Sequence, residues 1–387
     1  MNNKKARVIA FYLPQFHPTK ENDAWWGKGF TEWTNVGKAK PLFKGHYQPR
    51  VPADLGYYDL RMPEVREEQA KMAREAGIEG FCYWHYWFGN GKELLKLPFN
   101  EVLESGKPDF PFCLGWANHS WSNKTWLAGS KFKKDSVLME QTYPGKEEHI
   151  EHFYALLDAF KDKRYICVDG KPLFVVHSPA EIPDVTNFMN LWRNLAIENG
   201  LKGIHFVGIT NSIKNYVKVN DKKKYRIANL HEGGLLYKKT LDLGFDAINS
   251  RGFWRSEFIV KGRYMKFFHA VIKKVIGGVF LEKYKYKRII KNFYIMEDVW
   301  ENVYPTIFPQ WDRSPRAGKE AQIYTGSTPE LFKVHINDAL KIVAHKEDEH
   351  KLIFLMSWNE WAEGNYVEPD IVYGNGYLNV LKELINF

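Results

Sequence analysis

Apolar segments that alternate with helix-forming segments are the feature that most restricts the fold of this 387-residue chain. Short apolar runs, each long enough for one buried strand, occupy residues 7–13, 78–88, 110–116, 172–177, 203–210, 245–249, 304–311 and 352–357. Segments typical of helices lie between or after them, at residues 63–76, 93–105, 146–161, 185–199, 227–243, 329–344 and 376–387. Strands joined by crossover helices form a parallel sheet, so the pattern predicts an α/β protein.

About eight such units favour a closed (β/α)8 TIM barrel over a doubly wound open sheet. The sequence also lacks the glycine-rich phosphate fingerprint that is typical of doubly wound nucleotide-binding sheets. No linker and no longer repeat is visible. We therefore expect residues 1–387 to form a single domain with long βα loops, and an active site at the C-terminal ends of its strands.

Polar and aromatic side chains gather at or just after the ends of the predicted strands. These side chains should meet at one mouth of the barrel, although they are spread over the whole chain; they are Gln15, His17, His85, Tyr86, Asn118, His119, Asp312, Glu360 and Glu363. Along residues 78–88 the alternation of a strand places His85 on one face and Tyr86 on the other. Asp312 and Arg316 are candidates to bind substrate hydroxyls, or they pair with each other.

Residues 354–364 (FLMSWNEWAEG) turn an apolar strand into two carboxylates beside two indoles. Hydrolysis of a glycosidic bond needs one group that holds a proton and a second that acts as base or nucleophile. Glu360 and Glu363 are candidates for these roles, and the rings of Trp358 and Trp361 could stack on a sugar. A strand end with packed Trp and two solvated carboxylates is the alternative interpretation.

Residues 255–291 hold 11 Lys and Arg against Glu257 and Glu282, which accounts for the whole net charge of +9. This segment predicts a basic helical insertion between strands six and seven, with an amphipathic helix over residues 264–276. It packs on the barrel as an ordinary crossover, or it makes a peripheral contact with an anionic membrane. Because the charge is local, we expect no nucleic-acid partner.

Three cysteines, no signal-peptide pattern at the N-terminus and no apolar run as long as a membrane span predict a cytoplasmic protein. The sequence has no Gly-x-Ser-x-Gly elbow, Walker loop or Cys-x-x-Cys motif, and its histidines lack close ligand spacing. We therefore expect no metal and no cofactor.

Six longer motifs resemble the WbsX family of bacterial O-antigen and capsule gene clusters, which is related to glycoside hydrolase family 99, the endo-α-mannosidases. They are residues 11–18 (FYLPQFHP), 26–35 (WGKGFTEWTN), 45–49 (GHYQP), 80–88 (GFCYWHYWF), 327–332 (STPELF) and 358–364 (WNEWAEG). The resemblance implies a (β/α)8 barrel that acts on an oligosaccharide or polysaccharide.

By the family pattern, Glu360 would take a proton from the sugar 2-hydroxyl, and Glu363 would act as general acid and then as general base. We expect further residues to bind the glycan: Tyr12, Gln15, His17, Trp33, His85, Tyr86, Asn118, His119, Trp121, Trp311, Asp312, Arg316, Asn359 and Trp361. Two places depart from the pattern. His119 stands where many relatives have Glu, and residues 249–253 (NSRGF) differ.

Three functions are compatible with these observations. A retaining endo-glycosidase or transglycosidase acting on bacterial surface polysaccharide, or on its precursor, fits best. A glycosyltransferase is favoured by the label the family often carries, but the sequence shows neither paired Rossmann halves nor an Asp-x-Asp motif. A non-catalytic glycan-binding barrel would need neither glutamate.

Overall fold

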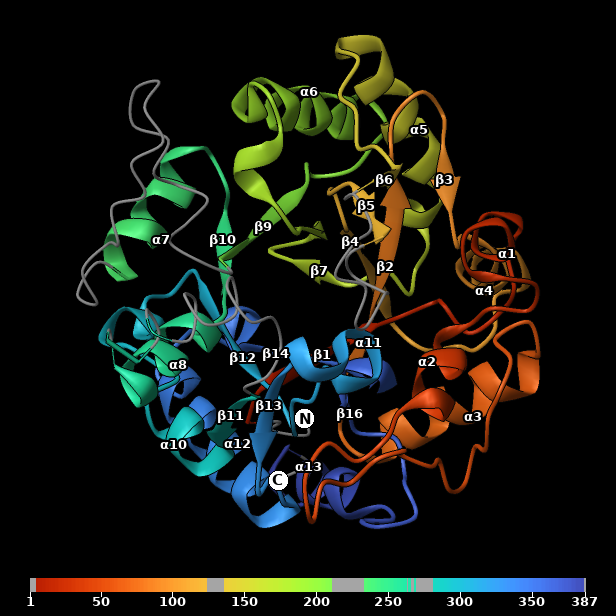
Figure 1. Ribbon diagram of the computed structural model, residues 1–387. Helices are drawn as coiled ribbons and strands as arrows, with labels where there is room; N and C mark the ends of the chain where they lie inside the picture. Colours follow the sequence, from red (N-terminus) through yellow and green to blue (C-terminus); the bar gives the residue numbers. More distant parts are fainter. Residues whose placement is uncertain are drawn as a thin grey trace.

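The computed structural model describes residues 5–123, 136–210, 233–262, 264–265, 268 and 281–385. Eight parallel strands form a closed barrel with helices around its outside (Figure 1). The barrel strands are β1 (Arg7–Tyr12), β2 (Gly80–Trp87), β4 (Phe112–Trp116), β8 (Lys171–Val176), β9 (His205–Thr210), β10 (Ala247–Ser250), β12 (Val303–Ile307) and β14 (Leu352–Leu355). Each pairs with the next, and β14 pairs with β1, so the TIM-barrel prediction is confirmed. That this one α/β domain includes all of residues 1–387 stays a prediction.

The strands are largely apolar because both of their faces are covered. All four residues of β14 are fully buried, as are Leu173 to Val176 of β8. One face of each strand fills the barrel, and the other packs against the surrounding helices. The continuous apolar runs of the sequence, rather than a strict alternation with polar residues, follow from this double burial.

The outer layer consists of helices whose apolar stripe faces the strands. They are α3 (Pro63–Glu75), α4 (Leu97–Ser105), α5 (Lys146–Lys161), α6 (Val185–Glu198), α7 (Gly233–Asp242), α8 (Phe253–Lys261), α10 (Tyr286–Lys291), α12 (Pro329–Val343) and α13 (Gly376–Ile385). In α6, for example, Phe188, Met189, Trp192 and Leu195 are buried at helical spacing. The start of α12 matches its sequence signal, since the Thr328 side chain accepts a hydrogen bond from the Leu331 amide (3.3 Å).

The long βα loops carry short elements of their own. After β1 lie α1 (Lys20–Trp26) and α2 (Glu32–Lys38), and after β12 lie α11 (Ser314–Ala317), η5 (Gly318–Glu320) and β13 (Gln322–Thr325). After β14 come β15 (Asn359–Glu360), η7 (Trp361–Glu363) and β16 (Asn365–Tyr366). The remaining elements are β3 (Glu93–Leu94), β5 (Trp121–Ser122), β6 (Val137–Met139), β7 (Cys167–Val168), η2 (Pro179–Glu181), β11 (Glu282–Lys285), η4 (Met296–Val299) and η6 (Asp348–His350).

The structure corrects two predicted boundaries. The helix expected at residues 93–105 begins only at Leu97, because Glu93 and Leu94 pair with the end of β2 as the antiparallel strand β3. The seventh strand ends at Ile307 instead of residue 311, since Pro309 has no N–H group with which to continue the ladder. Residues 308–311 therefore belong to the loop above the barrel.

The predicted insertion between strands six and seven is present. Its described parts are α8, β11 and α10. Most of the amphipathic helix expected at residues 264–276 lies outside the described residues. Tyr284, Tyr286, Ile289 and Ile290 are buried in one hydrophobic cluster with Phe293, Phe308 and Tyr324, so this part packs on the molecule as a crossover would.

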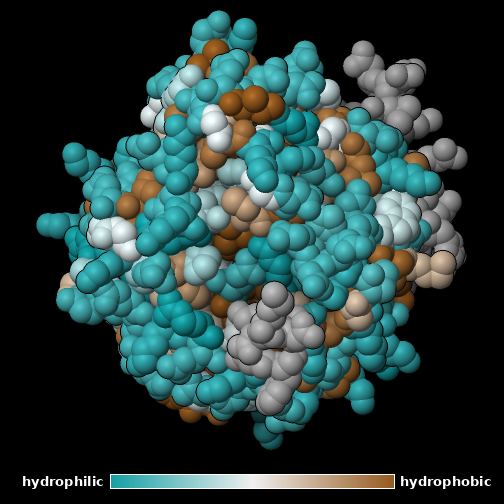
Figure 2. Space-filling view, turned by 180° about the vertical axis from the view of Figure 1, so that it is seen from behind, coloured by the Kyte–Doolittle hydropathy of each residue, from teal (hydrophilic) through white to brown (hydrophobic). Residues whose placement is uncertain are grey.

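Hydrophilic residues prevail on the face shown in Figure 2, where hydrophobic residues are scattered. Within the part of the chain that the structure describes, no helix is both long and apolar enough to cross a membrane. The cytoplasmic location stays a prediction.

Candidate active site

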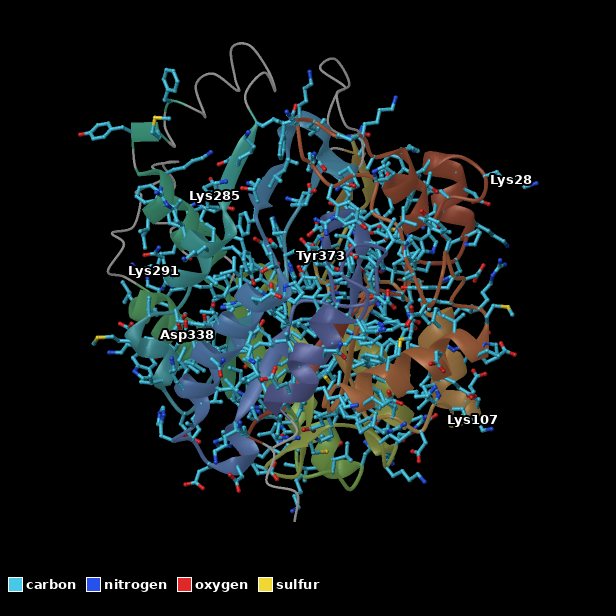
Figure 3. The ribbon with its side chains drawn as sticks, turned by 90° about the horizontal axis from the view of Figure 1, so that it is seen from below. Lys28, Lys107, Lys285, Lys291, Asp338 and Tyr373 are labelled. Carbon is cyan, nitrogen blue, oxygen red and sulfur yellow. The ribbon has the colours of Figure 1, made fainter. Side chains whose placement is uncertain are left out.

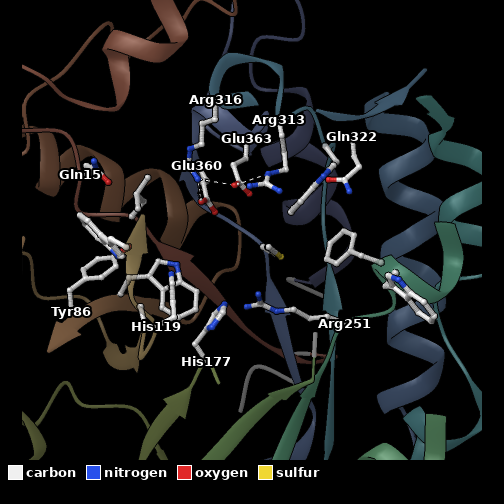
Figure 4. A pocket seen from close by; sticks show the side chains of 18 of the residues that line it. Gln15, Tyr86, His119, His177, Arg251, Arg313, Arg316, Gln322, Glu360 and Glu363 are labelled. Carbon is white, nitrogen blue, oxygen red and sulfur yellow. Dashed lines mark hydrogen bonds and ion pairs between the residues drawn. The ribbon is translucent and has the colours of Figure 1, made fainter. Parts of the chain in front are cut away.

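A cavity of about 450 Å³ opens at the C-terminal ends of the barrel strands (Figure 4). Residues that end or follow every barrel strand except β9 line it, and the residues that follow β9 lie outside the described ranges. Its wall includes six large aromatic side chains, Trp84, Tyr86, Trp121, Phe253, Trp254 and Trp311. Aromatic faces of this kind, beside a few convergent polar groups, are typical of a pocket that binds a sugar ring.

Glu360 and Glu363 enter the cavity from a small hairpin that follows β14. Glu360 ends β15, which pairs with β16, and Glu363 ends the 3-10 turn η7 between these strands. Residues three apart lie on one side of such a turn, so the Glu-x-x-Glu spacing aims both carboxylates the same way. Gly364 has φ +57°, and a Cβ atom there would lie 2.8 Å from the Asp312 Cβ, so the turn requires glycine.

Arg316 binds both carboxylates. Its Nη1 lies 3.1 Å from Oε1 of Glu360 and 2.8 Å from Oε1 of Glu363, while its Nη2 lies 2.9 Å from Oε1 of Glu32. Arg313 adds a second cation to Glu363, with its Nε 3.0 Å from the same Oε1. The pair is thus held by a network of charge-assisted hydrogen bonds.

The two carboxyl groups have opposite pKa shifts. Burial, followed by the negative charge of Glu363, raises the pKa of Glu360 to about 7. Arg313 and Arg316 lower the pKa of Glu363 against the opposing effect of burial. Of the two groups, Glu360 is therefore the one that holds a proton more readily, and Glu363 is the one that ionises more readily.

The comparisons with known proteins agree with this geometry. A family model described as "Glycosyltransferase WbsX" matches residues 8–381. The chain belongs to the WbsX family. Two relatives named "Uncharacterized protein WxcX", both from Xanthomonas campestris pv. campestris, are each 33% identical and match 98% of the chain. The chain spans about half the length of these curated relatives, since the match covers 50% of each.

Solved structures of similar fold include glycosidases. A "Glycoside hydrolase-like protein" aligns over 100% of this chain and 95% of its own, with a TM-score of 0.60 and 15% identity. The family 99 endo-α-mannosidase from Bacteroides thetaiotaomicron aligns over 98% of this chain and 95% of its own, with a TM-score of 0.53 and 12% identity. At this identity the likeness shows the fold alone. The WbsX chain therefore shares its barrel with a family of glycosidases.

Eight of the residues that the sequence singled out line the cavity of this WbsX protein: Gln15, Tyr86, His119, Trp121, Trp311, Arg316, Glu360 and Glu363. Strand alternation explains the case of Tyr86, which shares the inner face of β2 with Trp84. The placement is compatible with glycan binding, and their roles stay predictions.

Three of the expected binding residues lie outside the cavity and hold its loops together. Asn359 accepts a hydrogen bond from the Leu13 amide (2.8 Å) and donates one to the Leu13 carbonyl (3.0 Å). Asn118 donates to the Ser178 carbonyl (2.9 Å) and accepts from the Ser178 amide (2.8 Å). The Asp312 carboxylate accepts hydrogen bonds from Gln48 and the Ser314 amide, so it does not pair with Arg316 as one interpretation suggested.

Three others also lie outside the cavity. Tyr12 lies on the outer face of β1 and donates a hydrogen bond to Gln69 of α3 (2.6 Å). His85 lies on the outer face of β2, with its Nε2 2.8 Å from Nε2 of His152 in α5. His17 is buried, which lowers its pKa. Alternation along the strands explains the first two cases, because the neighbours of inward-facing residues face the helices.

Trp33 and Trp361 are packing residues. The Trp33 indole donates to the Tyr58 carbonyl (2.8 Å), and Trp361 donates to Glu368 (2.6 Å) while stacking on Tyr366. Both indoles are therefore oriented by neighbouring protein groups. No sugar can reach the face of Trp361 that covers Tyr366.

Several lining residues were not among the predicted site residues: Trp84, His177, Arg251, Phe253, Trp254, Glu257, Arg313, Gln322 and Met356. His177 and Arg251 come directly after β8 and β10, so the rule that polar residues follow the barrel strands could have found them. The sequence analysis also missed Glu32. Its role depends on a contact with Arg316, which lies 284 positions further along the chain.

Among the described residues, no group of three or more His, Cys, Asp or Glu is arranged to hold a metal ion.

Proposed function

We propose that this WbsX protein is a retaining endo-glycosidase or transglycosidase that acts on a bacterial surface polysaccharide or its precursor. The observation that carries the proposal is the pair of glutamates with opposite pKa shifts in a cavity walled by aromatic rings. Carboxyl groups whose environments separate their pKa values are typical of an acid and a base that work together.

The spacing of Glu360 and Glu363 supports a reaction that retains the configuration of the anomeric carbon. Both carboxylate oxygens lie within about 3 Å of the same Arg316 nitrogen, so they are at most roughly 6 Å apart. Retaining glycosidases place their carboxyl groups about 5–5.5 Å apart, whereas inverting enzymes need about 6.5–9.5 Å to admit a water molecule. The bound on the distance between these two oxygens lies below the inverting range.

We assign the roles by the family pattern, with Glu360 as base toward the sugar 2-hydroxyl and Glu363 as general acid and then base. The pKa shifts favour the proton on Glu360, so this assignment requires the proton to move to Glu363 when the glycan binds. Arg313 is the partner of Glu363 that can leave, since its side chain is 30% exposed against 7% for Arg316. Loss of that contact raises the pKa of Glu363 and allows it to take up the proton.

The name of the family supports a second candidate, a glycosyltransferase in the synthesis of lipopolysaccharide or capsule. One screen separates the candidates. The purified protein is incubated with bacterial O-antigen and capsule preparations, with and without nucleotide sugars, and the products are read by mass spectrometry.

We expect oligosaccharides of defined length, or glycosyl transfer between glycans, without any nucleotide sugar. The Glu360→Gln/Glu363→Gln double variant is the control and should form no product. Transfer that depends on a nucleotide sugar would instead establish the glycosyltransferase. Glycan binding without any product would indicate a non-catalytic barrel.

A further inference from the structure

A second cavity, of about 480 Å³, lies outside the active site between the first turns of α5 and α6. These helices come after β4 and β8, and they lie side by side on the outside of the barrel (Figure 1). We call this cavity the α5–α6 pocket. The lining residues on which the argument depends are Tyr143, Lys146, His149, Asp184, Asn187 and Phe188. The catalytic scheme uses none of them.

The α5–α6 pocket lies next to the active cavity. Both helices begin after the C-terminal ends of barrel strands, so the pocket belongs to the same end of the barrel as the active cavity. Ala117 and His119 line the active cavity. Asn118, which lies between them in the chain, donates a hydrogen bond to the hydroxyl of Tyr143 in the pocket (3.0 Å). A glycan chain that extends beyond the active cavity over this wall would reach the pocket.

Aromatic rings give the pocket an apolar and rigid side. Phe188 is 2% exposed, and its ring centre lies 5.7 Å from that of Trp116 and 4.9 Å from that of Trp192. The His149 ring packs on Phe188 at 4.8 Å, and the Tyr143 ring packs on Trp116 at 5.8 Å. Rings held in this way offer apolar surface to the C–H face of a sugar without a further loss of conformational entropy.

Polar groups with remaining hydrogen-bond capacity surround this apolar side. Within the described ranges, the His149 imidazole makes no hydrogen bond and Lys146 makes no ion pair. Burial lowers the pKa of His149, so its neutral ring provides one donor and one acceptor. The Asp184 carboxylate accepts a hydrogen bond from Asn187 (2.5 Å) and keeps further lone pairs. Such a mixture of donors and acceptors suits hydroxyl groups, which do both.

We propose that the α5–α6 pocket binds a sugar unit of the glycan chain away from the bond that reacts, so that the enzyme holds its polysaccharide at two places. The inference rests on the proposed function and extends the surface that binds the same substrate. The volume lies within the range of about 300–1,000 Å³ that is typical of small-ligand sites. Two contacts with one chain strengthen binding, because the second contact forms within the same complex.

Two other classes of ligand fit the pocket less well. A phosphate ligand would meet Lys146, but the carboxylates of Asp184 and of Glu147 in the first turn of α5 offset that charge. A lipid chain would cover His149 and the Asp184–Asn187 pair without offering them hydrogen bonds, which is unfavourable. A sugar ring has both an apolar face and hydroxyl groups at its edge.

The test reads the two cavities separately through the NMR resonances of histidine rings. Those of His149 report the pocket and those of His119 report the active cavity, each assigned by its His→Phe variant. The probes are glucose, galactose, mannose, rhamnose and N-acetylglucosamine, with inorganic phosphate as the competing class. Asn187→Trp places an indole in the pocket. Asn190→Trp is the matched control, since this residue is exposed on the same helix and does not line the pocket.

We expect at least one of the sugars to shift the His149 resonances saturably, with a Kd of about 1 mM, as suits a contact with a single ring. Asn187→Trp should abolish this response, and Asn190→Trp should keep it.

Kinetics test the contact with the chain. For the polysaccharide that the protein processes, Asn187→Trp should raise KM by about tenfold and leave kcat unchanged, because the pocket is remote from the reacting bond. His149→Phe keeps a ring on Phe188 without the ring nitrogens and should also raise KM. Small aryl glycosides do not reach the pocket, so both variants should process them like the wild type.

The proposal is overturned if none of these sugars shifts the His149 resonances, if the shift persists in Asn187→Trp, or if phosphate alone causes it. An unchanged KM for the polysaccharide in Asn187→Trp would also overturn it. The two proposals can fail separately. A His149 response to sugar in a protein that processes no glycan would contradict the proposed function alone. Processing of a glycan without that response would contradict the α5–α6 pocket alone.

Discussion

At the scale of single residues, the carboxylate pair depends on Arg316. The guanidinium is buried and contacts the carboxylates of Glu32, Glu360 and Glu363. Glu32 is itself fully buried and also accepts a hydrogen bond from the Ala362 amide (2.9 Å), which ties the hairpin to α2. We interpret Arg316 as a positioning residue rather than a contact to substrate hydroxyls.

Replacement of Arg316 by Gln should leave three carboxyl groups near one another without their shared cation. We expect the free energy of unfolding at pH 8 to fall by about 3–5 kcal/mol, the usual effect of removing one partner from a buried ion pair. The Arg316→Lys variant should lose less of its free energy of unfolding than Arg316→Gln does. Urea denaturation measures both.

Adding Glu32→Gln to Arg316→Gln should restore part of the lost stability, because it removes a buried charge that has no other cation within contact distance among the described residues. An Arg316→Gln variant as stable as the wild type would show that the network contributes nothing.

The raised pKa of Glu360 predicts a pH dependence of stability. Its folded-state pKa of about 7 exceeds the ordinary carboxyl value, so the folded protein binds this proton more tightly than the unfolded chain does. The resulting stability is present below about pH 4.5 and is lost as the pH rises through 7.

Between pH 5 and 8 the wild type should lose up to about 3 kcal/mol more stability than Glu360→Gln. Chemical denaturation at each pH measures the difference. Glu363, whose pKa is lowered, contributes stability that is instead lost as the pH falls. Parallel curves for the wild type and Glu360→Gln would contradict the raised pKa.

At the scale of elements, the hairpin from β15 to β16 sets where the carboxylates point. Gly364→Ala should destabilise this hairpin for two reasons. A φ of +57° is unfavourable for alanine, and the added Cβ atom would clash with Asp312. Gly374 offers a matched control, since its φ is +50° and a Cβ there would have no atom within 4 Å.

We expect Gly374→Ala to cost about 1 kcal/mol of stability and to keep activity. Gly364→Ala should cost about 1–3 kcal/mol more, as overpacking does, and should lower turnover. Thermal unfolding and kinetics of the two variants give the comparison. Equal effects would show that the contact between Gly364 and Asp312 is unimportant.

The sequence predicted the barrel because burial on both faces leaves a readable apolar run in every strand. It predicted that Tyr86 and His85 lie on opposite faces of their strand, because alternation is a local property, but it wrongly placed His85 at the mouth of the barrel. It did not separate residues that touch a sugar from those that hold loops. Asn118, Asn359 and Asp312 follow strands as the cavity residues do, and only their long-range partners reveal their role. Glu32 lies in the motif at residues 26–35, but no local feature showed that its carboxylate contacts Arg316.

At the scale of the whole molecule, the described part of the basic insertion presents one charged surface. We define the basic face as the exposed residues Lys283, Lys285, Lys287, Arg288 and Lys291. Figure 3 shows Lys285 and Lys291 on the same side of the molecule. Each such cation near an anionic membrane contributes about 1 kcal/mol of attraction. An enzyme that processes a lipid-linked glycan would benefit from this contact.

We expect the protein to co-sediment with phosphatidylserine vesicles at low salt and to be released at high salt. Exchange of Lys283, Lys285, Lys287 and Arg288 for Gln should weaken binding strongly. A control with Lys28, Arg61, Lys71 and Lys107 changed to Gln removes the same charge elsewhere and should bind like the wild type. Absence of binding at low salt, or equal loss in both variants, would refute the membrane contact.

We propose that Glu363 donates a proton to the leaving oxygen while Glu360 acts as the base. The most direct measurement compares Glu363→Gln and Glu360→Gln on glycosides with poor and with activated aryl leaving groups. Loss of general acid–base help should slow Glu363→Gln by about 10²–10⁴-fold on the poor leaving group. The activated leaving group should restore much of that rate, whereas Glu360→Gln should stay slow on both. Equal rescue of the two variants, or rescue of Glu360→Gln alone, would contradict the assignment.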